Sequence, residues 1–153
     1  MSAPHTGAVP RIVAGVDGSP SSIMALRWAV RQAELTGGTV DAVISWEFPI
    51  YAGGMGWAPA SPIDGTDYSE LADKALSAAV AEVSPPPGVT VRQVVVEGNA
   101  AQVLLDAAED ADLLVVGNRG HGGFADALIG SVSTRCLHHA SCPVVVVRLP
   151  KHH

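Results

Sequence analysis

Basic residues, cysteines and long hydrophobic runs are all scarce in this chain of 153 residues. Nine lysines and arginines stand against fifteen aspartates and glutamates, so the formal net charge is −6. A nucleic-acid surface needs a basic stripe, which this balance does not supply. Two cysteines do not make a disulfide framework, and no apolar run has the length of a membrane span. We therefore expect neither a nucleic-acid partner nor a membrane partner.

The sequence also lacks the marks of a signal peptide and of disorder. Residues 1–10 have no cationic start followed by an apolar stretch, which favours a cytoplasmic location. Hydrophobic residues make up 48% of the chain and charged residues 16%, a composition typical of a globular protein. We expect a flexible arm over residues 1–10, a single domain over 11–149, and a tail over 150–153 that resembles the remnant of an expression tag.

Several catalytic motifs are missing as well. Lys74 and Lys151 are the only lysines, and the phosphate-binding pattern G-x-x-x-x-G-K-[ST] does not occur. Neither G-x-S-x-G nor H-E-x-x-H is present. Phosphoryl transfer relies on a cation at the transferred group. We therefore expect a protein that binds a ligand with little turnover, and a slow ATP hydrolase is the enzymatic alternative.

Five short apolar segments predict strands, at residues 11–16, 39–46, 89–96, 113–116 and 143–148. Segments with helical spacing separate them, and each begins at a capping residue. The expected N-terminal signals are Ser19 before Pro20, Asp67 with Glu70, Asn99 with Gln102, and Ser131. Strands that alternate with helices and are nearly all apolar indicate a parallel sheet covered on both faces. The predicted fold is a doubly wound, Rossmann-like α/β sheet in the order 3-2-1-4-5.

The segment 47–67 is long, irregular and rich in proline and glycine. Such a loop is usually functional or mobile. Its Tyr51, Met55 and Trp57 suggest an alternative function, an interaction module that binds no nucleotide.

A glycine-rich stretch follows the fourth predicted strand. Glycine at Gly117 and Gly120 lets the backbone approach a ligand, and the helix predicted after Gly130 exposes N–H groups that favour phosphate. Arg119 and His121 are candidate phosphate contacts, and Gly122 and Gly123 make the loop permissive. In the expected strand order this loop lies beside the end of the first strand, at the switch point where such sheets bind ligands.

Asp17 follows the first predicted strand and faces that switch point. Because it is anionic, we expect it to bind ribose hydroxyls or a water on bound Mg²⁺ rather than phosphate. The alternative is that Asp17 is simply a turn residue in Asp-Gly-Ser-Pro. No metal-binding cluster is expected: Cys136, His138, His139 and Cys142 are close in sequence, but we interpret the histidines as favourable charges at a helix end.

Together these residues resemble the universal stress protein family. Its nucleotide-binding branch has G-x-x-G, nine residues and G-[ST] after the fourth strand, and the chain matches at Gly117, Gly120, Gly130 and Ser131. The early Asp17 also matches. The resemblance implies an ATP-binding protein of stress or dormancy with Mg²⁺, a regulatory partner of unknown identity, and a homodimeric state. It also implies that Trp46 offers its backbone to adenine, that Gly15 and Asp17 lie near adenine and ribose, and that the phosphates are surrounded by Gly117, Gly120, Gly130, Ser131 and Val132. With the other residues of the loop and of the helix start, the expected nucleotide-binding site also includes Asn118, Arg119, His121, Gly122, Gly123 and Ser133. Asn118 departs from the small residue that many members carry there.

The last predicted strand independently suggests a dimer. It lies at the sheet edge in the expected order, and its backbone would be unpaired beside a continuous run of valines, which natural edges normally cover or pair. The alternative is that the N-terminal arm covers it. We expect two copies to pair through Val144, Val145, Val146 and Val147.

Overall fold

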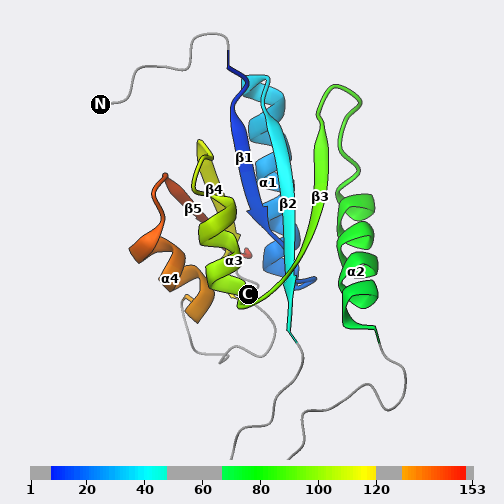
Figure 1. Cartoon of the computed structure of the whole chain (residues 1–153). Helices are drawn as coiled ribbons and strands as arrows, with labels where there is room; N and C mark the ends of the chain where they lie inside the picture. Colours follow the sequence, from blue (N-terminus) through cyan, green and yellow to red (C-terminus); the bar gives the residue numbers. More distant parts are fainter. Residues whose placement is uncertain (1–7, 48–66, 120–128, 151–153) are drawn as a thin grey trace, which may run out of the picture.

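The computed structural model describes residues 8–47, 67–119 and 129–150, and these form one parallel five-stranded sheet with helices on both faces (Figure 1). The strand order is β3-β2-β1-β4-β5, as predicted. Along the chain the elements are β1 (Arg11–Gly15), α1 (Pro20–Thr36), β2 (Thr39–Trp46), α2 (Tyr68–Val83), β3 (Val91–Glu97), α3 (Ala100–Ala107), β4 (Leu113–Gly117), α4 (Ser131–His139) and β5 (Val144–Val147).

Three of the four expected helix starts are confirmed. The side chains of Ser19, Asp67 and Asn99 each accept a hydrogen bond from a backbone N–H in the first turn of α1, α2 and α3. Gly37 ends α1 with a φ of 74°, a left-handed conformation that glycine adopts without strain. The fourth prediction was wrong, because Gly130 occupies the N-cap of α4 and Ser131 is the first helical residue.

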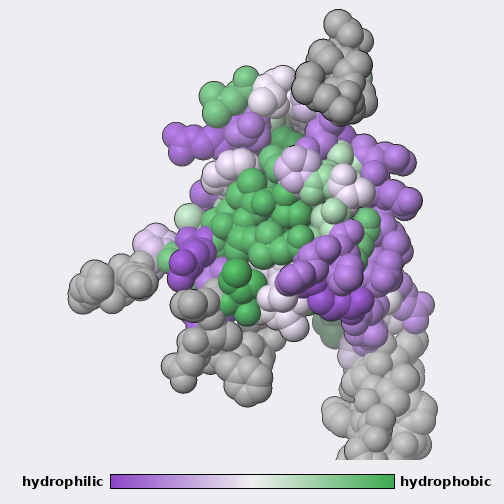
Figure 2. Space-filling model, turned by 90° about the vertical axis from the view of Figure 1, so that its left-hand side faces the viewer, coloured by the Kyte–Doolittle hydropathy of each residue, from purple (hydrophilic) through white to green (hydrophobic). Residues whose placement is uncertain are grey.

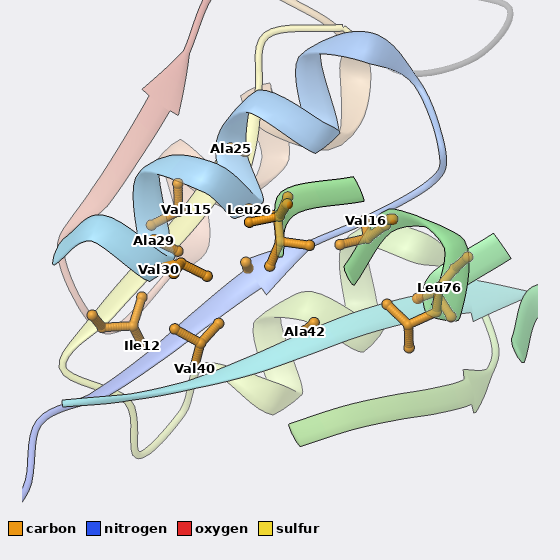
Figure 3. Close-up of a cluster of buried hydrophobic side chains, with 14 of the residues drawn as sticks. Ile12, Val16, Ala25, Leu26, Ala29, Val30, Val40, Ala42, Leu76 and Val115 are labelled. Atoms are coloured by element: carbon orange, nitrogen blue, oxygen red, sulfur yellow. The ribbon is translucent and has the colours of Figure 1, made fainter. Parts of the chain in front are cut away.

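Two layers of side chains hold the sheet between its helices. On the face of α1 and α2, residues such as Ile12, Leu26, Val40 and Leu76 form one core cluster (Figure 3). On the face of α3 and α4, Val13, Val43, Leu104 and others form a second. Alternate residues of each strand belong to opposite clusters, which is why the strands read as continuous apolar runs. Among the described residues, no helix combines the length and hydrophobicity that a membrane span needs.

The third strand was predicted two residues too early. Val89 donates its N–H to the Pro86 carbonyl at 3.0 Å and so closes a turn. Pairing with β2 begins only at Val91, opposite Val40. The hydrophobicity of Val89 reflects packing against the first core cluster rather than strand pairing.

Candidate functional site

A cleft opens at the carboxyl ends of β1, β2 and β4, between α3 and the start of α4. The chain leaves β1 toward β2 and leaves β4 toward β5 on the other side, so the cleft lies at the switch point of the sheet. Its empty volume, counted with the solvent in its open mouth, is about 480 Å³. Its lining consists of Gly15, Val16, Asp17, Ser22, Val43, Ser45, Ala100, Leu104, Val116, Gly117, Arg119, Val132 and Ser133.

The N-terminus of α4 differs from those of the other three described helices. Its N-cap, Gly130, has no side chain to accept a hydrogen bond from the first turn. Val132 and Ser133, in that turn, line the cleft. The first N–H groups of a helix have no partner within the helix, and together with the helix dipole they favour an anion. The cleft therefore has one end suited to phosphate.

Asp17 lies where the sequence predicts, at the mouth of the cleft after β1. Its carboxylate Oδ1 accepts the Ser19 N–H at 2.8 Å, while its own N–H donates to Ser22 Oγ at 3.2 Å. The interpretation of Asp17 as a turn residue therefore holds for its Oδ1 atom, which is hydrogen-bonded within the turn. The residue is nevertheless exposed and lines the cleft, so a ligand in the cleft would lie beside this turn.

Gly117 is a glycine for reasons of packing as well as position. A Cβ on Gly117 would lie 2.5 Å from Ser21 Oγ and 2.6 Å from the Ser21 carbonyl carbon. The start of α1 therefore packs directly on the end of β4. Hydroxyls of Ser19 and Ser21 donate to the Arg119 carbonyl, and Ser133 Oγ donates to the Gly117 carbonyl. Three serines, Ser19, Ser21 and Ser133, thus hold the backbone of Gly117 and Arg119, where the glycine motif begins.

The next residues of the motif are held by backbone bonds. Asn118 is buried; its N–H donates to the Val147 carbonyl at 2.9 Å and its carbonyl accepts the Gly130 N–H at 2.6 Å. Asn118 thus joins β4, β5 and the start of α4. Arg119 lines the cleft and is half-buried. Gly130 itself precedes the lining residues of α4, and Ser131 is exposed at the helix start.

Gly15 and Trp46 occupy different places relative to the cleft. Gly15 forms part of its floor, and a Cβ there would meet Leu104 Cδ1 at 2.7 Å. Trp46 ends β2, but its side chain packs with the opposite core cluster and its carbonyl accepts the Gly98 N–H at 2.8 Å. The residues of β2 that line the cleft are Val43 and Ser45.

Part of the predicted site and its surroundings lies outside the described residues. This applies to Gly120, His121, Gly122 and Gly123, and to Tyr51, Met55 and Trp57 in the loop. Conversely, sequence reasoning missed Val43, Ser45 and Ser22 on one side of the cleft and Ala100 and Leu104 on α3. Strand alternation and the face of α3 that packs on the sheet would have found most of them, since Val43 and Ser45 share the face of Gly15.

The cysteine and histidine cluster at the end of α4 does not form a second site. His138 and His139 lie in the last turn, as expected from the helix dipole. Cys136 is fully buried, and this burial raises the pKa of its thiol to about 11. Across the described residues, no group of three or more His, Cys, Asp or Glu side chains could hold a metal ion.

Fold and site define a doubly wound α/β protein that offers a helix N-terminus and a carboxylate to a ligand at its switch point. A family model described as the universal stress protein family matches residues 9–148. The chain belongs to the universal stress protein family.

Known relatives extend this assignment. A universal stress protein of Mycolicibacterium smegmatis is 38% identical over 146 residues, which are 89% of this chain and 47% of that protein. The chain thus spans about half the length of this curated relative. The universal stress protein UspA from Lactobacillus plantarum has a TM-score of 0.71 at 23% identity, covering 91% of this chain and 97% of that one. A universal stress protein solved in complex with cAMP has a TM-score of 0.59 at 26% identity, covering 94% and 99%.

Proposed function

We propose that this protein binds an adenine nucleotide, with ATP as the expected ligand, in the cleft between β1 and β4. The observation that carries the proposal is the uncapped N-terminus of α4, whose first turn borders a cleft with Asp17 at its mouth. The other three described helices use a side chain to satisfy an N–H group of the first turn. A bound phosphate would play that part for α4.

The remaining residues suit the other parts of a nucleotide. Val16, Val43 and Leu104 give the cleft apolar walls for a base. The carboxylate of Asp17 fits ribose hydroxyls, or a water on Mg²⁺ held by the phosphates. The related protein solved with cAMP supports an adenine nucleotide as the class of ligand.

The proposed role is regulatory, in a stress response and in the cytoplasm, with little turnover of the nucleotide. Arg119 is the one cationic side chain among the described cleft residues. No lysine lies in the described lining, whereas the phosphate-binding loops of ATPases place one at the phosphates. Release of inorganic phosphate from Mg-ATP slower than about one per second, the low end of ordinary enzymes, is expected.

The decisive experiment removes one N–H group from the first turn of α4 and leaves the helix intact. Ser131→Pro does this, because proline is favoured at the first helical position. Gly130 before it has φ −74° and ψ 168°, the extended conformation that a residue before proline adopts. Ser131→Ala is the matched control, since it removes the hydroxyl and keeps the N–H.

Calorimetric titration with ATP, AMP and cAMP, with and without Mg²⁺, gives the affinities. We expect Ser131→Pro to weaken ATP binding at least tenfold, because hydrogen bonds to charged groups contribute about 1.5–3 kcal/mol. Ser131→Ala should stay within about threefold of the parent, and the melting temperatures without nucleotide should agree. No binding of millimolar ATP by the parent protein, or equal affinities in both variants, would refute the proposal.

We further propose that two copies associate through β5. Figure 2 looks onto the side where β5 and α4 lie, and a hydrophobic patch occupies its centre. β5 is an edge strand whose four valines are only partly buried. Trp28 on α1 and Leu137 on α4 are exposed, and both helices contact β5. Exposed apolar patches beside an unpaired edge are typical of association surfaces.

A further inference from the structure

Ser45 interrupts an apolar row on β2. Ala42 and Ile44 face the α1 side of the sheet, whereas Val43 packs on the α3 side, and Ser45 lines the cleft on that same side. Val43 is 1% exposed, so the serine stands where the strand pattern favours another valine. Once a ligand fills the cleft and excludes water from this position, the hydroxyl needs a polar partner on that ligand.

The other cleft serines already have partners within the protein. Ser22 Oγ donates to the Ser19 carbonyl at 3.0 Å, and Ser133 Oγ donates to the Gly117 carbonyl. The Ser45 hydroxyl makes no hydrogen bond to any residue that the structure describes. It is half-buried in the cleft wall and free to bind a ligand.

The position of β2 decides which part of a ligand Ser45 meets. β1 separates β2 from β4, and strand spacing puts β2 about 10 Å from β4. Ser45 is therefore remote from the phosphate end at α4. The other residues that β2 and α3 contribute to the lining, Val43, Ala100 and Leu104, are apolar. If the phosphates lie at α4, the six-membered ring of a purine is the part of the nucleotide farthest from them.

We infer that the Ser45 hydroxyl hydrogen-bonds the polar edge of the six-membered ring and is the residue that selects for the base. This inference rests on the proposed nucleotide-binding function. A serine hydroxyl both donates and accepts, so it can pair with a ring nitrogen or with the exocyclic amino group. A ligand without polar atoms on that edge leaves the hydroxyl unpaired among apolar side chains, and a site built to hydrogen-bond rejects such analogues.

The test combines two ligands with three variants. The ligands are ATP and the 5′-triphosphate of benzimidazole riboside, which keeps the bicyclic shape but has only carbon in its six-membered ring. Ser45→Ala removes the hydroxyl, and Ser45→Thr keeps it in a residue that strands favour. Ser77→Ala is the matched control, because the Ser77 hydroxyl on α2 donates to Gln93 on β3 and neither residue lines the cleft.

Titration should show that Ser45→Ala weakens ATP binding about five- to tenfold, as expected for one hydrogen bond. Its affinity for the benzimidazole nucleotide should stay within twofold of the parent's. Ser45→Thr should retain most of the ATP affinity, and Ser77→Ala all of it.

Three results would overturn the assignment while leaving nucleotide binding intact: unchanged ATP affinity in Ser45→Ala, an equal loss for both ligands, or a Thr variant as weak as the Ala variant. Failure of the parent protein to bind ATP would instead remove the proposed function and this inference with it.

Discussion

Gly117 shows how a single residue can carry a binding motif and a packing constraint at once. Its Cβ position lies 2.5 Å from Ser21 Oγ and 2.8 Å from the Ser21 carbonyl oxygen, an atom that cannot rotate away. We therefore predict that Gly117→Ala destabilises the protein by about 1–3 kcal/mol even without nucleotide, the usual effect of overpacking.

Urea unfolding without ligand measures this effect, and Gly88→Ala is the control because nothing lies within 4 Å of a Cβ there. Its free energy of unfolding should agree with the parent's to within about 0.5 kcal/mol. Equal stability of the Gly117 variant and the parent would contradict the packing argument. Gly117→Ala is accordingly a poor test of binding, and Ser131→Pro is a better one.

Cys136 makes stability depend on pH at the alkaline end. Burial is the main cause that raises the pKa of its thiol to about 11, partly offset by the charge of Arg135. In the unfolded chain the thiol ionises at a lower pH, so the unfolded state releases a proton first. The ordinary pKa of the thiol is 9.0, so the contribution of Cys136 to stability is complete below about pH 9 and is lost as the pH rises toward 11.

Removal of the thiol should flatten this pH dependence. Between pH 8 and 11 we predict that the parent loses about 2 kcal/mol more of its unfolding free energy than Cys136→Ala. Other titrating groups are common to both proteins and cancel in the difference. Urea unfolding at pH 8, 9.5 and 11 measures it; parallel curves for the two proteins would show that the buried thiol has no such effect.

Residues also mark how far sequence reasoning goes at this site. Asp17 and Gly117 line the same cleft, and their positions at the ends of β1 and β4 could be predicted because turn chemistry and glycine patterns are local. We expected Ser131 to be the N-cap of α4. The N-cap is instead Gly130, which has no side chain to bind the N–H groups at the helix start and so leaves them to a ligand. Ser45 was missed because the α3 residues that line the same cleft come from far along the chain, and only the folded structure shows that its hydroxyl has no partner among residues 8–47, 67–119 and 129–150.

At the scale of elements, one carboxylate ties together four of them. Asp41 on β2 is 4% exposed and accepts hydrogen bonds from Arg11 Nε at 2.9 Å and from Arg92 Nη2 at 2.7 Å. Arg11 on β1 also donates to the Ala107 carbonyl at the end of α3, at 3.0 Å. The bidentate Arg92 belongs to β3, so the edge strand is held by this ion pair as well as by its backbone.

Loss of the shared carboxylate should therefore affect stability more than loss of the exposed Arg92. Breaking a buried pair costs about 3–5 kcal/mol, and we expect about 2 kcal/mol for Asp41→Ala because both arginines can reach solvent. Arg92→Ala should cost less, since its side chain is already 66% exposed. Lys74→Ala, which breaks the exposed pair with Glu70, is the control in urea unfolding. Equal effects of the Asp41 and Lys74 variants would refute the argument.

The order of the strands could be predicted because it depends on local sequence signals and general rules, whereas single contacts between side chains could not. Apolar runs, capping residues and right-handed crossovers are each set by local sequence or by general rules, and together they gave the order 3-2-1-4-5. The start of β3 was misplaced because Val89 is apolar for packing and not for pairing. The ion pair of Asp41 could not be foreseen, since Arg11 and Arg92 meet it only in the folded sheet.

At the scale of the whole molecule, the outer edge of β5 is the feature from which we predict whether the protein is a monomer or a dimer. Pro143 and Val147 use their carbonyls to pair with β4. In a parallel ladder alternate residues bond to the same neighbour, so the N–H groups of Val144 and Val146 point to the open edge. Val146→Pro removes one of these groups and keeps an apolar side chain, and proline is tolerated on edge strands.

We predict that light scattering at micromolar concentration gives the parent protein twice its chain mass of 15.7 kDa, and Val146→Pro a mass close to one chain. Because Val147 keeps its bond to Asn118 beside the cleft, the variant should bind ATP within about twofold of the parent if each copy holds a complete site; this agreement also shows that the variant is folded. If the parent protein has the mass of a single chain, the β5 edges of two copies do not pair. If Val146→Pro remains a dimer, the contact between the copies lies on another face.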